Sequence, residues 1–82
     1  PEGMGVLRVQ AGSFADLRNA QALLARIQRN FADGRIVHTD LPEGRRYRVQ
    51  IGRFLVEPEA HKASTSLDRM FSLQSFVIRD DG

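Results

Sequence analysis

Apolar and polar residues alternate in two short stretches of the chain, residues 6–11 and 46–51. A period of two residues is typical of a strand with one buried and one open face. The apolar side is Leu7, Val9 and Ala11 in the first stretch and Tyr47, Val49 and Ile51 in the second. The polar side is Arg8 and Gln10, then Arg46, Arg48 and Gln50. Both stretches are predicted strands that end at Gly12 and Gly52, where a missing Cβ allows a bend or bulge.

Apolar residues at helical spacing follow each strand. The first helix is predicted from an N-cap at Asp16 to about Asn30, and the second has Pro58 in its first turn. Their apolar stripes are Ala20, Leu23, Leu24, Ile27 and Phe31, then Ala60, Ala63, Leu67, Met70 and Phe71. Short strands are predicted at 35–39 and 75–79, and residues 40–44 form a turn between the two halves.

The two halves are copies of one unit. A shift of forty residues aligns residues 6–40 with 46–80, and ten of the thirty-five pairs are identical, against about two or three expected by chance. The identical pairs are Arg8/Arg48, Val9/Val49, Gln10/Gln50, Gly12/Gly52, Phe14/Phe54, Ala20/Ala60, Arg29/Arg69, Phe31/Phe71, Val37/Val77 and Asp40/Asp80. Two repeats are too few for a solenoid, so they are expected to pack together as one pseudo-twofold domain.

The predicted fold class is α+β, with the order βαββαβ of an RNP-like or ferredoxin-like domain. A four-stranded antiparallel sheet is expected to carry both helices on one face, over Phe14, Phe54 and the apolar strand residues, and to leave the other face open. The domain is expected at 6–80, with 1–5 a linker remnant and 81–82 a tail. Because the chain starts at Pro1 without an initiator Met or signal peptide, we expect it to come from a longer protein.

The amino-acid composition excludes several kinds of catalytic and metal site. The 82 residues include no cysteine, which excludes disulfides, thiolate catalysis and cysteine-ligated zinc. No apolar stretch approaches the roughly 20 residues that span a bilayer. The two histidines, His38 and His61, occupy unequal positions in the repeats, and the helix serines Ser64 and Ser66 look like surface residues. We therefore expect a binding domain with no catalytic residues, no metal and no cofactor.

The open face is the candidate binding surface. Gln10, Ser13, Arg46, Arg48 and Gln50 are expected to share it, with Arg8 beside them. In the last strand, alternation turns either Val77 or the pair Phe76 and Ile78 outward. An aromatic ring beside amide and guanidinium groups suits a sugar ring, although core filling is an equal alternative for Phe76.

The duplicated Arg-Val-Gln-x-Gly-x-Phe motif, each copy followed by an amphipathic helix, resembles the SPOR (sporulation-related) domain from about Val6 to Arg79. Finer features, in 31–35 and 74–78, are most similar to the C-terminal SPOR module of rare lipoprotein A proteins, whose other domain cleaves glycan. The resemblance implies an RNP-like fold that binds peptidoglycan glycan strands stripped of stem peptides. It also implies a place in the periplasm or cell envelope, at the division septum.

The family's binding positions correspond to Gln10, Ser13, Arg48 and Ile78. Some members have Trp where this chain has Arg46, so Phe76 or Tyr47 would have to supply the aromatic contact. We expect a monomer that neither binds nucleic acid nor enters a membrane. Two alternatives stay open: a single-stranded RNA binder with the same βαββαβ order, and a protein-interaction or dimerisation module that uses the open sheet.

Overall fold

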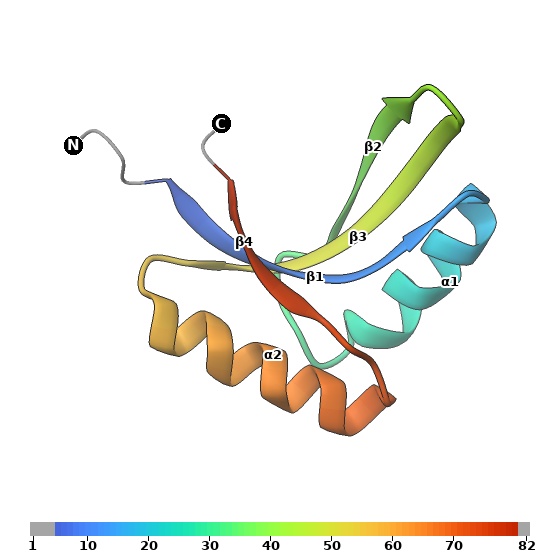
Figure 1. The fold of residues 1–82 in the computed structure, drawn as a ribbon. Helices are drawn as coiled ribbons and strands as arrows, with labels where there is room; N and C mark the ends of the chain where they lie inside the picture. The colour runs from blue at the N-terminus through green and yellow to red at the C-terminus, as the bar shows by residue number, and fades with distance from the viewer. Residues whose placement is uncertain (1–4, 81–82) are drawn as a thin grey trace.

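Residues 5–80 are described by a computed structural model, and they form four strands and two helices (Figure 1). In chain order these are β1 (Val6–Phe14), α1 (Leu17–Ile27), β2 (Arg35–Leu41), β3 (Gly44–Phe54), α2 (Glu57–Phe71) and β4 (Phe76–Asp80). All strand pairs are antiparallel, in the order β2-β3-β1-β4. The predicted α+β class and βαββαβ order are confirmed, with the two repeat-leading strands β1 and β3 at the centre. The linker predicted at 1–5 lies outside the described residues except for Gly5, as does the tail at 81–82.

Both helices lie on the same side of the sheet, and the β2–β3 hairpin rises away from them on the other side (Figure 1). The core between sheet and helices is built from the predicted apolar stripes. Its buried members include Val9, Ala11, Ala20, Leu23, Ile27, Val49, Ile51 and Leu67, and Phe14, Tyr47, Phe54 and Phe71 pack against them. Tyr47 therefore belongs to the helix side of the sheet.

The prediction of the α2 stripe is wrong at two positions. Met70 is exposed, and Ser64 is buried instead. The Ser64 hydroxyl lies 2.5 Å from the hydroxyl of Ser75 in the segment before β4, so the buried hydroxyl has a hydrogen-bond partner. Ser75 N–H also donates to Asp68 at 2.8 Å, which ties the end of α2 to the start of β4.

The strands extend beyond their predicted ends because Gly12 and Gly52 lie inside them at bulges. Between the pairs Leu7–Phe54 and Val9–Ile51, β3 carries one residue more than β1, and Gly52 takes a positive φ of 81° there. Between Gln10–Gln50 and Gly12–Val49 the extra residue is Ala11 on β1. A bulge reverses the side on which the following residues point. Ser13 thereby joins Gln10 on the open face, whereas simple alternation would have turned it inward.

The ends of the other elements also differ from prediction. Asp16 caps α1 as expected, accepting from Arg18 N–H at 2.9 Å, but the helix ends at Ile27 because residues 28–30 turn to bring Phe31 onto the core. The predicted five-residue turn at 40–44 is shorter, since Leu41 already pairs with Gly44. Gly44, with φ 134°, allows this tight hairpin.

Candidate functional site

The open face of the sheet carries rows of side chains that the strand register places side by side. Gln10 pairs with Gln50 on one side and with Phe76 on the other, and Gln50 pairs with Arg35. Register partners in antiparallel strands point to the same face. These four side chains therefore form one row across all four strands, called here the glutamine row. A second row joins Val37, Arg48 and Ser13, and Arg8 pairs with Ile78.

The two glutamines lie in the predicted place but are buried rather than solvated, with 7% and 5% of their surface exposed for Gln10 and Gln50. Arg35 contributes to this burial, since its Nε donates to Gln50 Oε1 at 3.2 Å. The Gln10 side chain makes no hydrogen bond within residues 5–80. At the centre of the face, the Gln50 amide is therefore held by Arg35, whereas the donor and acceptor groups of the Gln10 amide bond none of these residues.

Arg8 shares the open face, but its guanidinium is engaged by the protein. Its Nε donates to Asp80 Oδ2 at 2.8 Å and its Nη1 to the Gly52 carbonyl at 3.0 Å. Arg35 Nη2 reaches the same Asp80 oxygen at 2.6 Å. Asp80 on β4 therefore connects to β1 and to β2, across the sheet. These contacts give Arg8 a structural role, and the sequence analysis did not foresee it.

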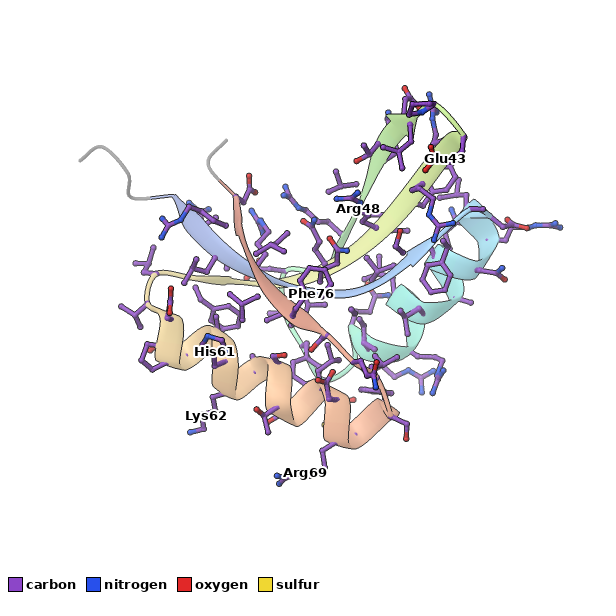
Figure 2. All side chains as sticks on the ribbon, in the orientation of Figure 1. Glu43, Arg48, His61, Lys62, Arg69 and Phe76 are labelled. Atoms are coloured by element: carbon purple, nitrogen blue, oxygen red, sulfur yellow. The ribbon has the colours of Figure 1, made fainter. Side chains whose placement is uncertain are left out.

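The other two arginines of the face differ in what they contact. The Arg46 guanidinium donates two hydrogen bonds to Ser13, from Nε to the hydroxyl at 3.2 Å and from Nη2 to the carbonyl oxygen at 2.9 Å. Arg48 Nε is buried and has no hydrogen-bond partner within the described residues. A buried donor without a partner is costly, at about 1–3 kcal/mol. Figure 2 shows Arg48 on the side of the sheet away from α2, while Lys62 and Arg69 project from α2 on the far side.

The alternation in β4 is resolved in favour of an outward Phe76. Val77 packs against the core, and Phe76 and Ile78 share the open face through their register partners Gln10 and Arg8. Phe76 is 54% exposed. Because Tyr47 packs toward the core, it does not supply an aromatic contact on this face. The seven predicted site residues therefore all lie on the open face, with Phe76 and Ile78 along one edge.

Residues 3–79 match the family model of the SPOR domain. The chain belongs to the SPOR domain family. Its structure resembles the crystal structure of the RlpA SPOR domain from Pseudomonas aeruginosa, with a TM-score of 0.80 and 23% identity over 90% of this chain and 99% of that one. It also resembles the solution structure of the peptidoglycan-binding domain of the B. subtilis cell wall lytic enzyme CwlC. There the TM-score is 0.73 and the identity 26%, over 98% of this chain and 95% of that one. No curated protein sequence matches the chain.

SPOR domains are non-catalytic modules of the cell envelope that bind peptidoglycan. In this SPOR domain the His61 Nε2 lies 4.0 Å from Glu57 on the exposed side of α2. His38 lies on β2 and belongs to the face of the sheet opposite Arg48, because its register partner is Tyr47. Residues 5–80 contain no cluster of His, Cys, Asp or Glu able to hold a metal ion. No helix in this described part is long and apolar enough to cross a membrane.

The sequence analysis missed Arg35 and Asp80, which shape this SPOR face as much as the predicted residues do. One signal was available for Asp80: it is identical to Asp40 at the equivalent repeat position, and both bind arginine. Arg35 carried no such signal, because its repeat equivalent is Ser75. Its contact with Asp80 joins two strands at opposite edges of the sheet, a proximity that depends on the curvature of the whole sheet.

Proposed function

We propose that this SPOR domain binds peptidoglycan through the open face of its sheet and selects glycan strands that have lost their stem peptides. The observation that carries the proposal is Arg48, whose buried Nε has no partner within the described residues. A charged donor held without an acceptor is poised to bind an anionic or polar ligand group. Its neighbours in the face, a buried amide pair and an exposed phenyl ring, suit a carbohydrate.

The chemistry of the stem peptide explains the selectivity. An intact peptide is joined to the lactyl group of N-acetylmuramic acid by an amide. Its removal leaves a carboxylate and clears space beside the sugar. Arg48 pairs with that carboxylate, in a charge-assisted hydrogen bond worth about 1.5–3 kcal/mol. Rejection of the bulky peptide at the open face supplies the other half of the discrimination.

The glutamine row supplies the contacts to neutral groups. Gln10 and Gln50 each offer an amide donor and acceptor, which match N-acetyl and hydroxyl groups of the sugar. Because both side chains are buried before the ligand arrives, little rotamer entropy remains to be lost on binding. Phe76 and Ile78 at one edge give an apolar surface for a sugar ring, while Ser13 positions Arg46 nearby.

The comparisons support this reading. The CwlC domain, at 26% identity, is a peptidoglycan-binding domain by its own description. Such selectivity would place a parent protein in the periplasm, at the division septum, where amidases strip the wall. A fusion of this domain to a fluorescent protein should then gather at the septum and lose that pattern in cells without amidases.

The decisive experiment is a pull-down of the domain with purified sacculi before and after amidase digestion. We expect stronger retention on the digested sacculi. Equal retention would leave a peptidoglycan binder without the proposed selectivity, and retention by neither would contradict peptidoglycan binding. A titration with single-stranded RNA at physiological salt tests the alternative function, for which the central strands β1 and β3 offer no outward aromatic residue among those described.

A further inference from the structure

A groove of about 500 Å³ lies between β1 and α1, away from the glutamine row. Its β1 wall is the run of four consecutive residues Ala11–Phe14. Side chains along a strand alternate between faces, so four consecutive residues line one groove only when it follows the edge of the strand. The groove therefore runs along the main chain of β1.

That edge of β1 has no strand beside it in the described part of the chain. β4 pairs with β1 from Val6 to Gln10 and goes no further. Over Ala11–Phe14, β1 has a neighbouring strand on the β3 side only. An open edge next to a helix is the geometry in which an extended peptide adds a strand to a sheet.

The opposite wall is one face of α1, with Asn19, Ala22, Leu23 and Arg26 at helical spacing, and Leu73 closes the groove from the segment before β4. Ala22 presents only a methyl group there, and Leu23, Leu73 and Phe14 make the lining apolar. The groove thus offers pockets for small or branched apolar side chains of an added strand.

The charged residues that line the groove and the hollow beside it are all positive. Arg26 lines it and also lines a neighbouring hollow of about 350 Å³ that contains Arg29. The Arg26 guanidinium lies 5.6 Å from the centre of the Phe71 ring, which positions it at the junction of the two hollows. None of the described residues that line either hollow is acidic. This surface therefore complements an anionic ligand.

We propose that this edge is a docking site for an extended acidic segment of a partner protein, which adds a short strand to β1 over Ala11–Phe14. Four residues at about 3.3 Å each span about 13 Å, so the segment pairs over four to five residues. Every second side chain of the segment points into the groove, an apolar one beside Leu23 and Leu73 and acidic ones beside Arg26 and Arg29. The site shares only Ser13 with the proposed glycan-binding residues, and the added strand lies along the edge of β1 opposite β3, so a parent protein can hold wall and partner at once.

The test is an NMR titration of the ¹⁵N-labelled domain with the peptide acetyl-Val-Thr-Glu-Thr-Glu-amide, whose valine and two glutamates share one face of an extended strand. We expect saturable shifts of the amides of Ala11–Phe14 and of α1 residues facing the groove. A peptide with Pro in place of the central Glu should bind at least about tenfold more weakly, because it loses a main-chain donor. A peptide with Lys in place of each Glu should bind more weakly as well, through charge repulsion.

Arg26→Gln should weaken binding of the acidic peptide about threefold, whereas the matched change Arg18→Gln on the same helix, outside the groove, should leave it unchanged. Denuded glycan should bind equally well with and without the peptide, so this result is independent of the glycan proposal. Absence of shifts at Ala11–Phe14, equal binding of the Pro peptide, or equal binding by the Arg26→Gln variant would overturn the proposal.

Discussion

Gln10 and Gln50 face each other as register partners at the centre of the sheet, and they occupy equivalent positions of the two repeats. The pseudo-twofold axis of the domain therefore passes between them. Their flanks are not equivalent, because Arg35 continues the row on one side and Phe76 on the other. A symmetric amide centre thus has a cationic end and an aromatic end, and under the proposed function this asymmetry would give a bound glycan strand a direction.

Arg48→Ala should weaken binding to denuded glycan about tenfold or more, because a charge-assisted bond of about 1.5–3 kcal/mol is lost and each 1.4 kcal/mol is a factor of ten. The fold should persist, since Arg48 Nε bonds no described residue. The matched control is Arg45→Ala, where the guanidinium binds Asp40 at the hairpin end. Calorimetry with a denuded oligosaccharide measures both, and equal affinity of Arg48→Ala and wild type would remove Arg48 from the site.

Phe76→Ala should reduce glycan affinity by about 1–2.5 kcal/mol if the exposed half of the ring is covered by a sugar. Met70→Ala is a well-matched control, since Met70 is 53% exposed against 54% for Phe76 but lies on α2. Thermal unfolding and calorimetry separate stability from binding. An equal effect of both substitutions on affinity would show that Phe76 makes no specific contact with glycan.

Gly52→Ala should cost about 2 kcal/mol or more of unfolding free energy, a fall in Tm of roughly 8 °C or more. Gly52 has a positive φ of 81°, and an added Cβ would collide with the Phe54 ring. Its N–H also donates to the Ala32 carbonyl at 2.9 Å. The repeat equivalent Gly12 lacks the positive φ, and its Cβ would lie 3.0 Å from Phe14 Cε2, so Gly12→Ala should cost less. Equal losses in the two variants would refute this explanation of the bulge.

Asp40 should titrate below 3.8, because the hydrogen bond from Arg45 Nε, 2.6 Å from its Oδ1, lowers the pKa of the Asp40 carboxyl. A lowered folded pKa stabilises the fold above the unfolded value of 3.8, and this contribution is lost as pH falls through the lower folded pKa. ¹³C NMR of the Asp40 carboxyl measures the midpoint. Arg45→Gln should move the midpoint back up toward 3.8, and no movement would contradict the assignment.

The fold could be predicted from periodicity because, within each element, the apolar residues recur at the spacing of a single kind of secondary structure. Val9 and Val49 alternate with polar residues, and Leu23 and Ile27 recur at helical spacing, so strand, helix and face follow locally. The same reasoning placed Met70 in the core wrongly. It lies at the edge of its stripe, where the position of α2 against the sheet decides burial.

Seven members of the candidate face could be predicted from the sequence, but Arg35, Asp80 and the hydrogen bonds of the face could not. Gln10 and Gln50 follow from alternation, but their burial depends on Arg35, which comes from another strand. Ser13 reaches the face only through the bulge at Ala11, for which the neighbouring Gly12 was the one local sign. Contacts between strands far apart in sequence, such as Arg35 with Asp80, arise from twist and curvature that no local pattern encodes.

The most direct measurement is an NMR titration of the domain with a denuded tetrasaccharide of alternating N-acetylglucosamine and N-acetylmuramic acid, observing the side-chain NH₂ groups of Gln10 and Gln50 and the Nε–H of Arg48. If the open face is the glycan site, all three signals shift saturably with one affinity, while the amides of Lys62 and Arg69 on α2 stay in place. Saturable shifts confined to α1 and α2, with the two glutamine NH₂ groups unmoved, would contradict it.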